Sequence, residues 1–240
     1  GSSFIELSDI PQPWRTQFET ALRGSGAPAP GPDGHRAWAQ DWEAWLSGKW
    51  AGRPGPVAVL VIDLECTCAD DGSITSEDSE IIEIGAVWAT LEGFILDRFE
   101  ALVKPVERPH LTPFCVALTG IEQAGVDSAQ TFPAVAAELA EFAQRYISIA
   151  QCWASWGAAD KRQIDRERVH HGIIDPLLGL AHENLKADFA KSRKIKRVGM
   201  KMALEIVGLP LEGTHHRALS DAENVAKLLP WSNLTRNQRE

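Results

Sequence analysis

The stretch that decides the fold runs from Val57 to Thr67 and reads VAVLVIDLECT. Residues 57–62 are all apolar, as expected for a strand that is covered on both faces in the centre of a sheet. Asp63 and Glu65 follow directly, and residues two apart on a strand project from the same face. The sequence therefore predicts a buried strand that ends in two neighbouring carboxylates.

Two carboxylates at the end of a buried strand repel each other, and burial deprives them of the water that would solvate their charges. A divalent cation would relieve both costs, and a site built from oxygen ligands suits Mg²⁺ or Mn²⁺. Taken alone, the pair does not distinguish a cation site from a chance pair of acids at a strand end.

The composition is that of a folded chain with a net negative charge. Its 240 residues are 44% hydrophobic, which is enough for one large domain or for one domain with an extension. We expect a soluble, cytoplasmic protein without membrane contact, because we find neither a signal peptide nor a long apolar stretch. Its four cysteines lack the paired spacing of a zinc site. The net charge of −9 argues against a protein that coats nucleic acid non-specifically.

The pattern divides the chain into a Trp-rich helical N-terminal extension over 1–55, a main domain over 56–232 and a polar tail over 233–240. We expect helices over 13–22 and 35–46, joined by a Gly/Pro-rich linker over 24–34. The simpler interpretation is that the tryptophans pack against the main domain, and the alternative is a surface for a protein partner or nucleic acid. The extension carries five of the nine tryptophans: Trp14, Trp38, Trp42, Trp45 and Trp50.

In the main domain, strands come first and then alternate with helices, which indicates an α/β fold around a mixed sheet. Strands are predicted over 57–62, 81–89, 94–103 and 149–153. Helices are predicted over 132–146, 159–170, 184–190, 199–207 and 218–229.

Two later segments place polar residues at the ends of predicted elements. Asp160 begins the helix after the strand at 149–153, where an ordinary helix cap is the simpler interpretation. His216 lies on the loop that enters the last helix, and Asp221 lies one turn into that helix, where it can face the first strand. Each of these residues alone is more often structural than chemical.

Their order along the chain is distinctive: Asp-x-Glu, a later Asp after a strand, and His-x4-Asp at the last helix. This pattern resembles the DEDDh 3′→5′ exonuclease superfamily, which has a ribonuclease-H-like fold, over about 57–229. Ser220 departs from the family pattern, because many relatives have a second acid at this position. Other stretches are similar to the histone-mRNA 3′-end and RNA-interference-linked exoribonuclease branch and its bacterial relatives: 64–68 (LECTC), 114–121 (FCVALTGI), 126–127 (VD), 131–132 (TF), 183–186 (ENLK) and 213–217 (GTHHR).

The resemblance implies hydrolysis of single-stranded RNA from its 3′ end, with release of nucleoside 5′-monophosphates. His216 would be the general base, and His215 is the second candidate. A DNA exonuclease and a catalytically inactive nucleic-acid-binding module are the alternatives. Four carboxylates would hold two divalent cations, Mg²⁺ or Mn²⁺, as metal ligands: Asp63, Glu65, Asp160 and Asp221.

The resemblance and a basic stretch over 186–201 also suggest where the substrate would lie. Residues 118–121 would pack against the terminal nucleotide. The Lys and Arg side chains of the basic stretch would follow the phosphates upstream of that nucleotide. A solvated helix face and loop is the alternative for the basic stretch. The predicted substrate-binding residues are Cys66, Thr67, Leu118, Thr119, Gly120, Ile121, Trp156, Lys186, Arg193, Lys194 and Lys196.

Overall fold

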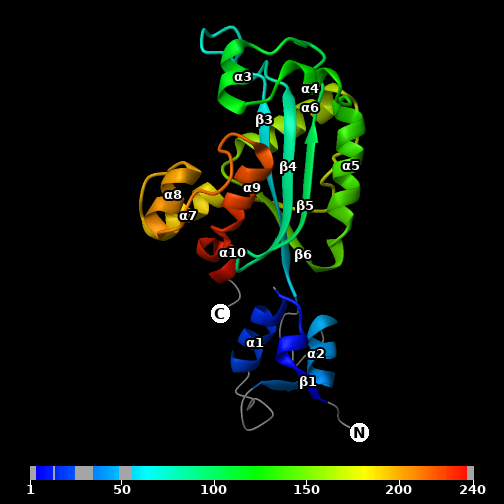
Figure 1. Cartoon of the computed structure of the whole chain (residues 1–240), viewed down its shortest axis with the longest axis vertical. Coiled ribbons are helices and arrows are strands. Elements are labelled where there is room, and N and C mark those ends of the chain that lie inside the picture. Colours follow the sequence, from blue (N-terminus) through cyan, green and yellow to red (C-terminus); the bar gives the residue numbers. More distant parts are fainter. Residues whose placement is uncertain (1–3, 13, 25–34, 49–55, 237–240) are drawn as a thin grey trace.

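A five-stranded mixed sheet forms the centre of the main domain in the computed structural model, which describes residues 4–12, 14–24, 35–48 and 56–236 (Figure 1). The spatial order of the strands is β5-β4-β3-β6-β7. β4 is antiparallel to both β3 and β5, whereas β6 is parallel to both β3 and β7. The strands are β3 (Ala58–Cys66), β4 (Ile81–Thr90), β5 (Ile95–Leu102), β6 (Ala150–Ser155) and β7 (His182–Asn184).

Helices cover both faces of this sheet (Figure 1). α5 and α6 lie on one face, and α9 lies on the other together with α7 and α8. The helices are α3 (Pro113–Thr119), α4 (Gln123–Asp127), α5 (Phe132–Gln144), α6 (Ala159–His170), α7 (Leu185–Arg193), α8 (Met200–Val207), α9 (Ala218–Ala226) and α10 (Asn233–Arg236).

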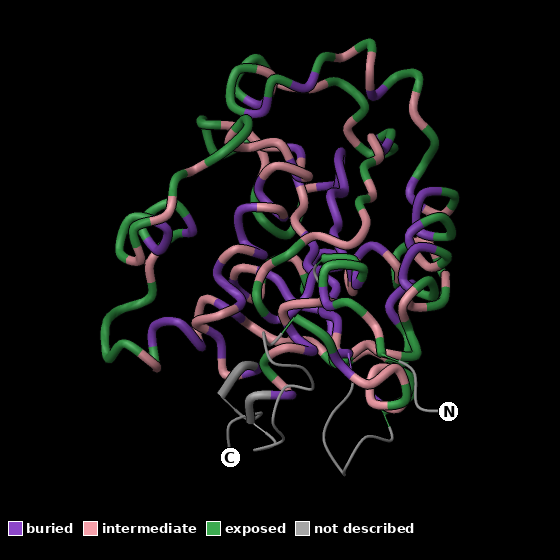
Figure 2. The backbone as a smooth tube through the Cα atoms, turned by 60° about the horizontal axis from the view of Figure 1, so that its bottom comes forward, coloured by how far each residue is buried: buried purple, intermediate pink, exposed green. Residues whose placement is uncertain are grey.

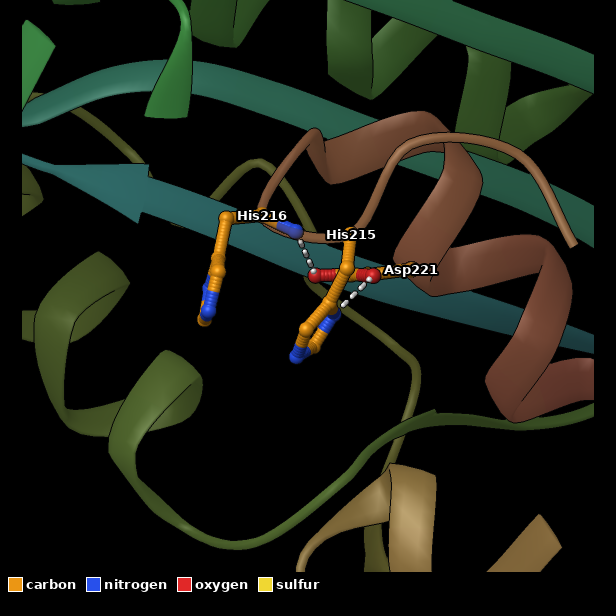
Figure 3. Close-up of side chains that lie close together, drawn as sticks. All are labelled: His215, His216 and Asp221. Atoms are coloured by element: carbon orange, nitrogen blue, oxygen red, sulfur yellow. Dashed lines mark hydrogen bonds and ion pairs between the residues drawn. The ribbon is translucent and has the colours of Figure 1, made fainter. Parts of the chain in front are cut away.

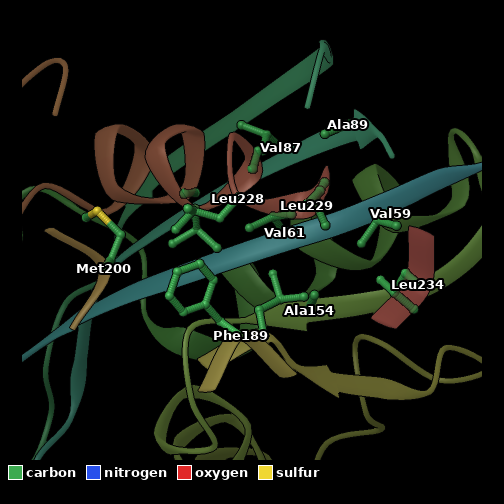
Figure 4. Close-up of a cluster of buried hydrophobic side chains, with 14 of the residues drawn as sticks. Val59, Val61, Val87, Ala89, Ala154, Phe189, Met200, Leu228, Leu229 and Leu234 are labelled. Atoms are coloured by element: carbon green, nitrogen blue, oxygen red, sulfur yellow. The ribbon is translucent and has the colours of Figure 1, made fainter. Parts of the chain in front are cut away.

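The alternation of side chains along β3 assigns its residues to two separate cores. Leu60 and Ile62 pack toward α5 and α6. Val59 and Val61 pack in the core under α9, shown in Figure 4 beside Phe189 of α7. Burial is concentrated in the sheet and the inner helix faces, as Figure 2 shows. Asp63 and Glu65 continue the row of Val59 and Val61, so both carboxylates lie on the α9 face.

The predicted mixed α/β sheet is confirmed, and so are its four predicted strands and five predicted helices, with shifts of a few residues at their ends. The short elements α3, α4 and β7 were not among the predicted ones. Thr112 caps α3 by accepting a hydrogen bond from the Cys115 amide, and Pro113 starts it. A helix this short shows too little periodicity to be recognised from apolar spacing.

The N-terminal extension has its own small core, made by α1 (Trp14–Gly24), α2 (Ala39–Leu46) and the strand pair β1 (Phe4–Glu6) and β2 (Arg36–Trp38). The predicted helix over 35–46 is therefore wrong at its start, and the extension is not purely helical. For Trp14, Trp42 and Trp45 the expected packing on the main domain is wrong, because they pack in this small core, with Trp42 and Trp45 on each other and on Phe18.

The extension touches the main domain through Gln17, whose Nε2 donates to Glu92 Oε2 at 2.8 Å. Trp50 and residues 25–34 of the expected linker lie outside the described residues, as does the predicted boundary at residue 55, which stays a prediction. Of the tail predicted over 233–240, residues 233–236 form α10, whose Leu234 packs in the main core. Among the helices of the described residues, none is long and apolar enough to span a membrane.

Candidate active site

Three carboxylates meet where the carboxyl end of β3 faces the first turns of α9. One oxygen each of Asp63, Glu65 and Asp221 lies within 4.8 Å of the others. Glu65 and Asp221 are buried, with 8% and 5% of their surface exposed. The same-face projection predicted for Asp63 and Glu65 therefore brings both against α9, and the predicted position of Asp221 one turn into that helix completes the group.

Asp160 joins this group from the first turn of α6. Ala158 occupies the cap position, so Asp160 is not the helix cap that the simpler interpretation expected. Its Oδ1 instead accepts a hydrogen bond from the Leu64 amide at 3.2 Å, which ties α6 to the end of β3 between Asp63 and Glu65.

The electrostatics of the four acids disfavour a full set of negative charges. Burial raises the pKa of Asp63, and the charges of Asp160, Glu65 and Asp221 raise it further. Burial together with Asp221 and other neighbouring carboxylates raises the pKa of Glu65 to about 8. Burial also raises the pKa of Asp160 to about 7. A buried group of oxygen ligands with excess negative charge fits a hard divalent cation, so this group can hold a divalent metal ion.

Two histidines adjoin Asp221, and Figure 3 shows their rings beside each other on the loop that enters α9. The ring centroids are 3.9 Å apart. His215 Nδ1 lies 2.9 Å from Asp221 Oδ1, and the backbone amide of His216 donates to Asp221 Oδ2 at 3.1 Å. His216 has a φ of 63°, a left-handed conformation that is uncommon outside glycine. A ring nitrogen of His216 lies within 4.8 Å of an Asp221 oxygen, and the His215 ring lies within hydrogen-bond distance of the same carboxylate.

The segment over 118–121 presents only part of its surface to a substrate. Thr119 and Ile121 are buried, each with 2% of its surface exposed, whereas Leu118 is 38% exposed. Phe114, one turn before Leu118 on the same face of α3, is 36% exposed and was missed as a candidate. Gly120 is the left-handed C-cap of α3.

Cys66 and Thr67 have different surroundings at the end of β3. Thr67 is buried, and its hydroxyl accepts a hydrogen bond from the Glu80 amide. Cys66 lines a cavity of about 280 Å³ together with Asp160 and Arg162, and Asp160 is the site acid that borders it. Sequence reasoning missed Arg162, because an arginine on the exposed side of a charged helix gives no signal of its own.

The basic residues lie on α7 and the segment that joins it to α8. Within the described part of the chain, Lys186, Arg193, Lys194 and Lys196 form no ion pair with a carboxylate. The indole of Trp156 donates to Val198 O at 3.0 Å, which fastens this segment to the loop that leads into α6 and Asp160.

The RNase_T family, described as Exonuclease, matches residues 60–229 of this chain. The 3'-5' exonuclease eri1 of Schizosaccharomyces pombe is 26% identical over 202 residues, which cover 71% of this chain and 66% of that protein. ERI1 exoribonuclease 2 of Mus musculus is 30% identical over 195 residues, covering 72% of this chain and 28% of that protein. The chain thus spans less than two thirds of the length of either relative.

The fold is shared with the nuclease domain of 3'hExo, a DEDDh family member solved with rAMP, with a TM-score of 0.66 and 24% identity. The match covers 76% of this chain and 93% of that one. The expected ribonuclease-H-like fold and the predicted resemblance to the DEDDh exonucleases are confirmed. The chain therefore belongs to the exonuclease family.

Proposed function

We propose that this chain is a metal-dependent 3′→5′ exoribonuclease that removes nucleotides from single-stranded RNA and releases nucleoside 5′-monophosphates. The observation that carries the proposal is the meeting of Asp63, Glu65 and Asp221, from β3 and α9, within 4.8 Å of one another. The names of the two relatives, an exonuclease and an exoribonuclease, favour a free RNA end as the substrate.

In this proposal each acid of the site has a role in metal binding. Asp63, Glu65, Asp160 and Asp221 hold two divalent cations, Mg²⁺ or Mn²⁺, through their carboxylate oxygens. When bound, such cations stabilise the charge on the transferring phosphate and lower the pKa of a bound water. The four side chains are held by β3, α6 and α9 before any ligand binds, so little reorganisation is needed on binding.

The proton of the attacking water is taken up by the ring of His216. Burial and the neighbouring His215 lower the pKa of His216, so its ring is neutral and able to accept a proton near pH 7. His215 Nδ1 is hydrogen-bonded to Asp221, whereas the His216 ring nitrogen lies within 4.8 Å of that carboxylate, which favours His216 for this role.

A cavity of about 280 Å³ lies on the α6 side of β3, where Asp160 is the site acid that lines it. This volume lies just below the ~300–1,000 Å³ of pockets for drug-sized ligands, so it suits one nucleoside rather than several. Leu118 and Phe114 offer apolar contact on α3. The upstream strand would then run along the unpaired cations of 186–196, because phosphates attract such cations.

Digestion of matched RNA and DNA strands with free 3′ hydroxyls tests the proposal. RNA should be degraded to nucleoside 5′-monophosphates in Mn²⁺ or Mg²⁺, and EDTA should stop the reaction. Asp63→Asn should abolish it while the circular dichroism spectrum stays unchanged, because the variant loses one metal-binding charge. Faster loss of DNA would identify a DNA exonuclease, and full activity of folded Asp63→Asn would overturn the site assignment.

A further inference from the structure

A fifth acid, Glu83, is buried beside the proposed reaction centre without belonging to it. Glu83 stands on β4 directly opposite Glu65, and none of its surface is exposed. Its Oε2 lies 2.7 Å from Arg217 Nη2, and its two oxygens accept from Arg217 Nε at 3.2 Å each. Its Oε1 also accepts from the Ala218 amide at 2.7 Å, so this carboxylate is saturated by the residues that open α9.

Two positions along β4, Gly85 stands opposite Asp63. A Cβ atom added at Gly85 would lie 2.2 Å from the carbonyl carbon of Ala218 and 2.2 Å from the amide nitrogen of Leu219. Real Cβ atoms essentially never approach this closely, and both atoms belong to backbone that cannot turn aside. The first turn of α9 therefore rests directly on the backbone of β4, and only glycine permits this approach.

These contacts fix the residues on which catalysis would depend. Asp221 lies one turn after Arg217 and donates its amide to Arg217 O at 2.9 Å. His216 immediately precedes Arg217 and donates its own amide to Asp221. A shift of the start of α9 on β4 would therefore move Asp221 and His216 together, away from Asp63 and Glu65 on the neighbouring strand.

We propose that Glu83, Gly85 and Arg217 form an anchor, named here the α9 anchor, that positions Asp221 and His216 against Asp63 and Glu65. The three members are positioning residues, and Glu83 binds no cation because Arg217 and Ala218 occupy its oxygens. The inference rests on the proposed function for its catalytic consequence, whereas its consequence for metal binding is measurable without RNA.

The variant Arg217→Gln distinguishes positioning from a purely electrostatic role and from a role in general stability. If Arg217 acted only through its charge, its removal would leave the site more negative and tighten Mn²⁺ binding. Positioning predicts the opposite, because Asp221 loses its fixed place. If the anchor served only general stability, a less stable protein would still bind Mn²⁺ and turn over normally at temperatures where it is folded.

The test measures Mn²⁺ affinity by isothermal titration calorimetry without RNA, and kcat and KM on a short RNA, for four variants. These are Gly85→Ala, Glu83→Gln, Arg217→Gln and the double variant of Glu83 and Arg217. Each should bind Mn²⁺ about 10–100-fold more weakly, the usual loss when a group that orients a metal ligand is removed. We expect kcat to fall while KM stays within about twofold, and the double variant to lose little more than either single variant.

Gly125→Ala is the matched control, because its added Cβ meets only the tip of the Leu102 side chain, at 3.0 Å. It should leave Mn²⁺ affinity unchanged. Arg217→Lys, which keeps the charge but loses the forked contact, covers the case in which Gly85→Ala does not fold, and it should also weaken binding. Unchanged or tighter Mn²⁺ binding by folded Arg217→Gln and Arg217→Lys would overturn the α9 anchor. Active Asp63→Asn would instead overturn the proposed function, so the two failures are distinguishable.

Discussion

At the scale of single residues, Asp221 is the point where the histidine loop meets the carboxylate group. Its Oδ1 is bound by the His215 ring and its Oδ2 by the His216 amide, while the same side chain faces Asp63 and Glu65. In the proposed site, His215 would orient Asp221 as a metal ligand through this hydrogen bond, and the ring of His216 would be the one left for proton transfer.

These different roles predict that replacing His216 and replacing His215 lower kcat by unequal amounts. His216→Ala should lower kcat at least about tenfold more than His215→Ala, because a general base contributes about 10²–10⁴-fold. The acid limb of the wild-type kcat profile should lie below pH 6.5, since burial and His215 lower the pKa of His216 from that value. Steady-state kinetics from pH 5 to 8 provide the measurement, and equal losses would leave the base unassigned.

That these residues lie close together could be predicted from the sequence, but their contacts could not. Asp63 and Glu65 could be predicted to share a face because strand periodicity is local. The bond of the His215 ring to Asp221 could not be predicted, because it depends on how the loop meets α9. Glu83 and Arg217 were missed for a similar reason: their pairing spans β4 and α9 and has no local pattern.

At the scale of elements, α6 is held to the start of β4 by a buried acid. Glu167 Oε2 accepts from the Ile81 amide at 3.0 Å and from Gln163 at 3.3 Å. Burial raises the pKa of Glu167 from 4.5 to about 7, against the opposing effect of these hydrogen bonds. Folding therefore favours the protonated acid.

Stability should accordingly depend on pH through this residue. The contribution of Glu167 is complete below pH 4.5, the unfolded value, and is lost as pH rises through the folded pKa of about 7. Glu167→Gln removes this loss, so its stability relative to wild type should rise between pH 5 and 9, by up to about 3 kcal/mol. Urea denaturation of wild type and Glu167→Gln at pH 5 and at pH 9 measures this difference in the free energy of unfolding. Glu205→Gln on α8 is the control. The prediction would be contradicted if the stability of wild type and that of Glu167→Gln changed with pH by the same amount.

The basic residues at the end of α7 and just after it should affect long substrates but not short ones. Replacing Arg193, Lys194 and Lys196 by Gln should raise KM for a long single strand and flatten its salt dependence, because fewer counterions are released. A dinucleotide ends before this surface, so its hydrolysis should hardly change. Arg145→Gln, which removes an exposed cation from the other face of the sheet, is the control. Equal losses on both substrates would mean that the segment supports the site or the fold.

Long elements were predictable and short ones were not. The apolar run of β3 and the spacing of α5 and α6 carry enough residues to show their periodicity. The helix α3 has seven residues, and the strand β7 has three and forms by pairing with β6. The extension was misjudged because the sequence shows that its tryptophans are apolar but not what they pack against.

At the scale of the whole molecule, the charge distribution follows the proposed use of the surface. The chain carries a net charge of −9, and four of its acids meet at the end of β3 while basic residues follow one another over 186–196. The loop bearing Trp156 links the two regions through Val198. An acidic centre beside a basic surface suits a metal-dependent enzyme on a polyanion, whereas an acidic surface throughout would repel the strand.

The most direct test of the central claim is the degradation of one single-stranded RNA labelled at its 3′ or its 5′ end, with and without Mn²⁺. The proposed activity predicts that, with Mn²⁺, the 3′ label is released at once as a mononucleotide while the 5′-labelled strand shortens gradually. Without Mn²⁺, and with Asp63→Asn, both labels should stay on full-length RNA. Early release of the 5′ label, internal fragments, or degradation that persists in EDTA would contradict a metal-dependent 3′→5′ exonuclease.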